Sequence, residues 1–142
     1  MKKLFTLLAL TISFSMNAQM SDNSANNNTA GSYAVAMGLL TTASGIVSTA
    51  MGERTTASGN YSTAMGLSTT ASGSTSTAMG SYTTASGSRS TAMGYSTTAS
   101  DYGSLVIGQY NSSGSSVTNN ATSFNTANTA FVIGNGTNSS NK

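Results

Sequence analysis

Cysteine, histidine, proline and tryptophan are all missing from this 142-residue chain. Without cysteine there is no disulfide framework and no thiol for lipid attachment. Without histidine and cysteine the chain lacks the side chains that most often serve as general base, nucleophile or transition-metal ligand. Asp22, Glu53 and Asp101 are far apart in the sequence, and the many serines have no visible base beside them. We therefore expect no enzyme activity, no catalytic or cofactor-binding residues, no cofactor and no metal site.

Charge and large apolar side chains are also scarce. Charged residues make up 6% of the chain and apolar residues 37%, against about 25% and about 45–50% in ordinary globular domains. With so few large apolar side chains, hydrophobic burial within one protomer hardly offsets the conformational entropy that the chain loses on folding. A disordered Ser/Thr/Asn/Gly tract is therefore one interpretation. The strict phase of the repeats described below argues against disorder.

The N-terminus has the pattern of a secretory signal. Two lysines precede an apolar run at residues 4–14, which is too short to span a bilayer. The pattern predicts a signal peptide at 1–18, cleaved between Ala18 and Gln19, with a retained membrane anchor as the alternative. After cleavage, three basic residues balance three acidic ones, so no basic footprint for nucleic acid remains.

A fourteen-residue unit organises the rest of the chain. Each unit has two seven-residue halves, one containing Ala-Met-Gly and the other Ala-Ser-Gly, and the fifth copy of the second half ends in Asp101 instead of glycine. A fixed short period of this kind indicates a repeat architecture. The triplets end, in chain order, at Gly38, Gly45, Gly52, Gly59, Gly66, Gly73, Gly80, Gly87 and Gly94.

These halves predict strands and not helices. A coiled coil needs apolar a and d positions and tolerates little glycine, whereas here glycine recurs every seven residues among Thr and Ser. Short Thr-rich strands punctuated by glycine fit a β-solenoid, so we expect an all-β fold, a parallel β-roll of 14-residue coils. Each half is expected to supply a strand of four or five residues and a tight corner, where glycine adopts positive φ without steric cost.

The period also divides the chain. The predicted segments are the signal peptide at 1–18, a flexible lead-in at 19–28, the repeat array at 29–108, a degenerate repeat with a loop and a last strand at 109–134, and a disordered tail at 135–142.

Alternation along the strands assigns the interior. Successive strand side chains point to opposite sides, so the alanines of both halves fall on one face. We expect a thin interior built essentially of alanine, too small to stabilise a lone protomer. It would contain Ala36, Ala43, Ala50, Ala57, Ala64, Ala71, Ala78, Ala85, Ala92, Ala99 and Val106.

The two outer faces then differ. One presents only Thr-x-Ser pairs, the first at Thr42 and Ser44, and suits water. The other is an apolar stripe that would be an association site on a secreted protein. We expect this stripe to be buried between subunits; methionines that merely fill a protomer core are the alternative. The stripe contains Met37, Met51, Met65, Met79, Met93, Leu105 and Ile107.

The run Gly59-Asn60-Tyr61-Ser62-Thr63-Ala64-Met65-Gly66, its fourteen-residue echoes and Ser104-Leu105-Val106-Ile107-Gly108 resemble the YadA-like head repeats of trimeric autotransporter adhesins. The resemblance covers roughly residues 29–108 and the last strand near 130–134. It implies a left-handed parallel β-roll, a homotrimer with the apolar stripe at its core, and display at the surface or outer membrane of a Gram-negative-type bacterium. Heads of this kind bind host matrix proteins or other surfaces, a role linked to virulence.

The chain departs from that family pattern after residue 134. No coiled-coil stalk or series of amphipathic strands follows, so we expect no membrane anchor in this chain.

Three functions stay open. The first is an adhesin head that binds host matrix, cells or abiotic surfaces through its extended polar exterior by multivalent contact. The second is a spacer or fibre segment without a ligand. The third is an ice-binding solenoid that uses the Thr-x-Ser ladder. Candidates for specific contacts are the side chains expected at exposed corners, namely Tyr61, Tyr82, Tyr95, Tyr102, Arg54 and Arg89.

Overall fold

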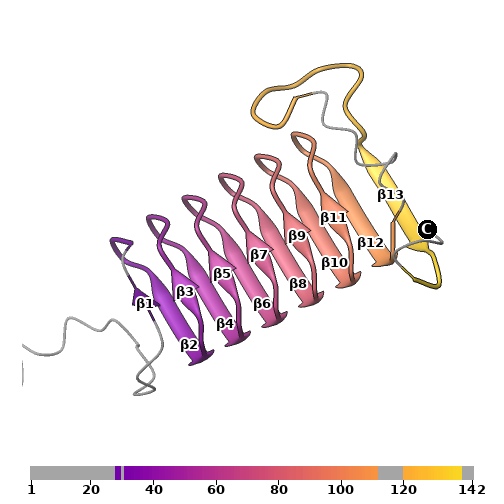
Figure 1. Cartoon of the computed structure of the whole chain (residues 1–142). Coiled ribbons are helices and arrows are strands. Elements are labelled where there is room, and N and C mark those ends of the chain that lie inside the picture. Colours follow the sequence, from indigo (N-terminus) through magenta and orange to yellow (C-terminus); the bar gives the residue numbers. More distant parts are fainter. Residues whose placement is uncertain (1–27, 30, 112–119, 139–142) are drawn as a thin grey trace, which may run out of the picture.

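The computed structural model describes residues 28–29, 31–111 and 120–138. The predicted signal peptide, its cleavage site at Ala18 and Gln19, and nearly all of the lead-in lie outside this part of the chain, as do residues 139–142 of the tail. The described residues form strands, turns and bends without a helix, and the parallel strands stack into a solenoid (Figure 1). The predicted all-β solenoid of 14-residue coils is confirmed.

Each coil contributes a long strand to one sheet and a short strand to the other. Sheet A has seven strands in the order β13-β12-β10-β8-β6-β4-β2, and sheet B has six in the order β1-β3-β5-β7-β9-β11. The strands of sheet A are β2 (Val35–Leu39), β4 (Thr49–Glu53), β6 (Thr63–Leu67), β8 (Thr77–Ser81), β10 (Thr91–Tyr95), β12 (Leu105–Gln109) and β13 (Phe131–Asn135). Those of sheet B are β1 (Asn28–Thr29), β3 (Thr42–Ala43), β5 (Thr56–Ala57), β7 (Thr70–Ala71), β9 (Thr84–Ala85) and β11 (Thr98–Ala99).

The second half-unit therefore forms a shorter strand than the expected four or five residues, because the chain must turn at both ends of it. All pairings are parallel and in register. Up to β12 each residue lies beside its equivalent fourteen positions away, for example Met51 beside Met65 and Thr56 beside Thr70, whereas β12 pairs with the more distant β13. Side chains of one kind consequently form columns along the solenoid.

The interior is thin and contains more than alanine. The expected alanines and Val106 are 0 or 1% exposed. Two columns of Thr and Ser side chains flank the alanines. The prediction of an interior built essentially of alanine was therefore wrong. These columns are also buried, because Thr and Ser at the strand entrances have the same inward phase as the alanines. They contain Thr41, Thr55, Thr69, Thr83 and Thr97, and Ser48, Ser62, Ser76, Ser90 and Ser104.

Glycine is required mainly where neighbouring coils touch. A Cβ built on Gly73 would lie 2.1 Å from the carbonyl oxygen of Gly87, and one built on Gly66 would lie 1.9 Å from that of Gly80. Real Cβ atoms do not approach backbone that closely, so both glycine columns are fixed by the contact between coils. The Gly66 column also has positive φ, near +120°.

The corners themselves use other residues. Non-glycine residues with φ between 44° and 60° recur every seven positions from Tyr33 to Tyr110, and Gly103 fills the one remaining step. The expectation that glycine occupies these left-handed corner positions was therefore wrong at every step except Gly103. Each corner amide donates to the corner carbonyl of the preceding coil, as Tyr61 N does to Ile46 O at 2.7 Å. These hydrogen bonds offset a conformation that costs roughly 1–2 kcal/mol per residue.

Replacing Gly73 with alanine should destabilise the fold by roughly 4 kcal/mol or more, the range reached by severe packing faults. The physical reason is the 2.1 Å approach of the new Cβ to the Gly87 carbonyl. The matched control is Gly103→Ala, whose Cβ meets no atom within 4 Å and which should cost only about 1 kcal/mol for its positive φ. Thermal unfolding followed by circular dichroism measures both, and equal losses would contradict the steric explanation.

Replacing Thr69 with valine should stabilise the protein by about 1 kcal/mol. The Thr69 hydroxyl is fully buried and has no hydrogen-bond partner among the described residues, and valine has the same shape without the buried polar atom. The control is Thr70→Val on the half-exposed outer face, which should change stability by less than about 0.5 kcal/mol. A lower unfolding midpoint for Thr69→Val would show that the hydroxyl makes a stabilising contact.

Candidate interaction surfaces

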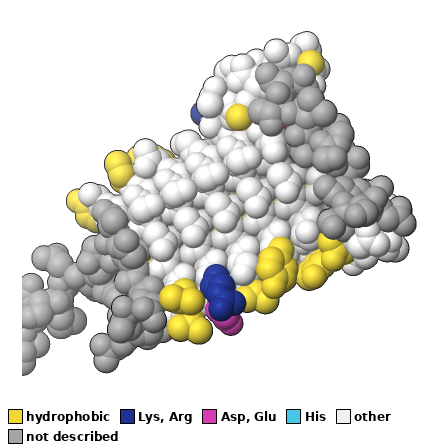
Figure 2. Space-filling view, viewed as in Figure 1, with side chains coloured by type: hydrophobic (Ala, Val, Ile, Leu, Met, Phe, Trp, Pro, Cys, Tyr) yellow, Lys and Arg dark blue, Asp and Glu magenta, His cyan; other side chains and the backbone are white. Residues whose placement is uncertain are grey.

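The outer face of sheet B is polar and flat. Figure 2 shows it as an unbroken field of uncharged polar side chains and backbone, with charged and apolar side chains confined to its margins. Thr70 is half-buried on this face and Ser72 is exposed, and the equivalent pairs of the other coils lie in register with them. This face offers hydroxyl groups at a regular spacing and no charge.

The outer face of sheet A carries the apolar stripe. Met37, Met51, Met65, Met79 and Met93 pair in register from coil to coil, and Ile107 and Ile133 continue the column. The methionines are half-buried in the single protomer and lie on the outside of the roll, not in its core. Leu105 and Phe131 continue the neighbouring column, which begins with Val35 and otherwise contains threonine.

The first corner, which follows the long strands, forms a ridge of apolar and aromatic side chains. Its exposed members include Leu39, Leu40, Tyr82 and Tyr95. The rings of Tyr82 and Tyr95 meet edge-to-face with centroids 5.9 Å apart, and those of Tyr95 and Tyr110 with centroids 5.2 Å apart. Edge-to-face pairs of this kind contribute about 0.5–1.5 kcal/mol beyond area burial.

The phenols of Tyr95 and Tyr110 lie next to each other at the end of this ridge. The hydrogen bond with Tyr95, together with partial burial and the charge of the neighbouring phenolate, raises the pKa of Tyr110 above its ordinary value.

The same corner holds an exposed ion pair. Arg54 Nη1 lies 3.2 Å from Glu53 Oε1, and the two side chains are 61% and 44% exposed. An ion pair this open to solvent contributes little to stability.

The second corner, which precedes the long strands, differs in character along its length. Tyr33 is 86% exposed and Tyr61 is exposed as well. Further along, Arg89 donates a hydrogen bond to the Tyr102 hydroxyl and lies over the Tyr102 ring, with its Cζ 5.0 Å from the ring centroid. The corner candidates thus fall on two separate edges of the solenoid and do not form one cluster.

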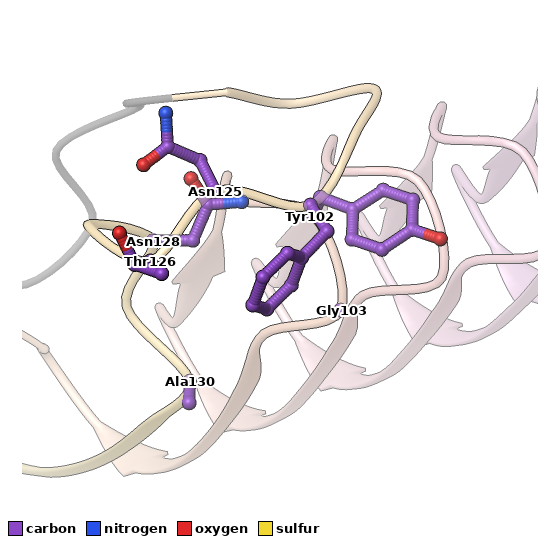
Figure 3. A pocket seen from close by; sticks show the side chains of 7 residues that line it. Tyr102, Gly103, Asn125, Thr126, Asn128 and Ala130 are labelled. Atoms are coloured by element: carbon purple, nitrogen blue, oxygen red, sulfur yellow. The ribbon is translucent and has the colours of Figure 1, made fainter.

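The segment from 120 to 130 carries a surface that sequence reasoning missed. Tyr102, Gly103, Phe124 and Ala130 line a cavity beside the second corner together with polar loop residues (Figure 3). A bulky aromatic residue within an otherwise Asn-, Ser- and Thr-rich stretch was the one signal that pointed to it.

The described ranges contain no group of three or more His, Cys, Asp or Glu side chains that could hold a metal ion. Within the same ranges no helix is long and apolar enough to cross a membrane.

Comparison with family models decides the relationship. A model described as YadA head domain repeat, in two copies, matches five overlapping segments, 30–54, 43–69, 57–83, 71–97 and 85–111. The matches span more than half of the chain. The chain belongs to the YadA head repeat family. Searches of curated proteins and of solved structures gave no match.

Membership of this family assigns the repeats to a general type of protein module. YadA heads are the adhesin head modules of trimeric autotransporters, and the family is a structural one. The repeat matches begin at residue 30 and end at residue 111, so the loop and β13 lie beyond them.

Replacing Tyr95 with phenylalanine should lower the pKa of Tyr110 toward its ordinary value, because the hydrogen bond with the Tyr95 hydroxyl is the largest cause of the upward shift. Tyrosine-selective isotope labelling and an NMR titration at alkaline pH would measure it. Tyr61→Phe, at the opposite corner, is the control and should leave Tyr110 unchanged. An unaltered pKa in Tyr95→Phe would show that burial, and not this hydrogen bond, sets the value.

Proposed function

We propose that this chain is a secreted adhesin head displayed at the cell surface of a Gram-negative-type bacterium, where it assembles as a homotrimer through the outer face of sheet A. The observation that carries the proposal is the apolar stripe of Met37, Met51, Met65, Met79, Met93, Leu105 and Ile107, which is half-buried in one protomer and opposite a purely polar face. Its signal peptide at 1–18 delivers it to that location.

The energetics favour association. The interior of one protomer is built of alanines, one valine and hydroxyl side chains, so it buries few large apolar groups. Removing the methionine stripe from water in three copies adds apolar burial that a single roll cannot supply. Methionine fills irregular gaps because its side chain is unbranched and flexible, which gives an adaptable interface.

In this assembly the polar face of sheet B and the corner side chains remain outside. Repetition along the solenoid and threefold symmetry together present each surface group many times, so weak single contacts add up to firm attachment to host matrix, cells or abiotic material. Tyr61, Tyr82, Tyr95, Tyr102, Arg54 and Arg89 are the proposed specific contacts at the corners.

Light scattering on the secreted chain tests the assembly, with Met65→Lys as the decisive variant. The wild type should have three times the protomer mass. Three lysines near the threefold axis would each lose hydration and repel one another, at roughly 3 kcal/mol or more per buried charge, which weakens assembly at least about a hundredfold.

Thr70→Lys, on the polar face of the same coil, is the matched control and should leave the trimer intact. A folded wild-type monomer, or a trimer that withstands Met65→Lys and dissociates with Thr70→Lys, would overturn the assignment of the interface. Circular dichroism of each variant separates loss of assembly from loss of fold.

Binding of the wild-type trimer to immobilised matrix proteins, host cells and plastic tests adhesion. Replacing the six corner side chains together with serine should weaken it. A trimer that binds none of these surfaces would identify a structural spacer instead. Thermal hysteresis in a nanolitre osmometer would identify an ice-binding solenoid that uses the Thr-x-Ser ladder.

A further inference from the structure

Hydrogen bonds hold the stretch from 120 to 129 against the solenoid near both of its ends. Ser88 N donates to Ala121 O at 2.7 Å, and Tyr102 N donates to Asn120 O at 2.9 Å. At its far end Thr129 N donates to Asp101 Oδ2 at 2.7 Å. Both ends of the stretch from 120 to 129 are thus held against the second corner.

Asparagine side chains shape the loop between these anchors. Asn120 Oδ1 accepts from the backbone of Thr122 and Ser123 at 3.0 and 2.9 Å. Asn128 Nδ2 donates to Asn120 O at 3.1 Å and to Ser123 O at 3.2 Å. These bonds close the loop on itself, so the surface beside it is formed before any ligand arrives.

The cavity under this loop has the size of a small-molecule site. Its volume is about 380 Å³, toward the lower end of the roughly 300–1,000 Å³ typical of ligand pockets. Figure 3 shows Asn125, Thr126 and Asn128 on the loop and Gly103 on the solenoid backbone beside it, and Phe124 completes the lining from the loop. Phe124 is 76% exposed, so its ring is available for contact with a ligand.

The lining carries no free charge. The Tyr102 hydroxyl, which points away from the cavity in Figure 3, accepts the hydrogen bond from Arg89. The nearest carboxylate, that of Asp101, is buried and accepts from Thr129. What remains for a ligand is an aromatic face beside amide and hydroxyl groups, a combination that suits an uncharged molecule with one apolar face and several hydroxyls.

One acceptor of the loop remains unsatisfied. Asn128 Oδ1 is shielded from solvent and has no hydrogen-bond partner within the described part of the chain, although Asn128 Nδ2 donates twice. This oxygen lies behind the lining, so hydrogen bonds to a ligand would come from Asn125 and Thr126, which are exposed on the same lining. These groups favour a ligand with hydroxyls over a purely apolar one.

We infer that this cavity binds a neutral sugar ring, which stacks its C–H face on Phe124 and donates hydroxyl hydrogen bonds to the amide wall. The inference deepens the proposed adhesin function by naming a glycan as one class of ligand, and it rests on that function only for its biological use. The site lies between the loop and the last matched repeat, to which Tyr102 and Gly103 belong.

Saturation-transfer NMR on the full secreted chain tests the site, with the methyl glycosides of glucose, galactose, mannose and N-acetylglucosamine as probes. At least one should receive saturation at its ring C–H protons. Phe124→Ala should reduce that signal at least fivefold because it removes the stacking face, and Phe124→Trp should retain it. Tyr33→Ala removes an equally exposed aromatic side chain at the far end of the same corner and should leave the signal unchanged.

The site inference is overturned if none of the four glycosides binds, if Phe124→Ala binds as well as the wild type, or if Phe124→Ala and Tyr33→Ala lose the signal equally. Binding of the charged methyl sialoside in place of all four neutral probes would overturn the assignment to neutral sugars. Because binding is measured on the free protein, a negative result here leaves adhesion to matrix or cells standing. If the chain binds sugar but does not adhere to any surface, the site inference stands and the adhesin proposal is contradicted.

Discussion

Close backbone contact between successive coils is the constraint on which this structure depends. At both glycine columns the carbonyl of the next coil stands about 2 Å from where a Cβ would be, so each coil must repeat the phase of the one before it. Asp101 occupies the position that glycine has in the preceding units. A larger side chain is tolerated there because β11 is the last of the described strands of sheet B. Freed from the stacking contact, its side chain turns to the backbone of Thr129 and anchors the loop.

The side-chain amide of Asn111 caps the last strand of sheet B by forming the hydrogen bonds that a further strand would form. Asn111 Oδ1 accepts from Thr98 N at 2.7 Å, and its Nδ2 donates to Thr98 O at 3.0 Å. One amide thereby satisfies both backbone groups of an edge that would otherwise offer a template for another chain. Sheet A meanwhile gains β13, which pairs in register with β12. Among the described residues, the fourteen-residue period therefore ends where sheet B ends, while sheet A continues by one strand.

The period and the alternation of side chains were enough to predict the coils and the phase of the alanines, because a strand's two faces follow directly from residue parity. The corners were not predictable in the same way. Val47 and Thr75 adopt φ near 55° although β-branched residues avoid that region, since hydrogen bonds between coils at every corner outweigh the local preference. The buried hydroxyl of Thr69 was missed because composition alone assigns threonine to water, and the loop around Phe124 follows no period at all.

In the proposed trimer the two outer faces of the roll would have separate roles, because the thin interior does little to stabilise a lone protomer. Association through the methionine stripe would cover one face of sheet A, while the polar face of sheet B stays in water. The loop with the cavity is bonded to the corner at Ser88 and Tyr102 and not to the methionine column, so assembly leaves it accessible. Within the described residues, the stretch from 120 to 129 meets the coils through its own backbone, at Ser88, Tyr102 and Asp101. Side chains such as Phe124 could therefore vary without changing these bonds.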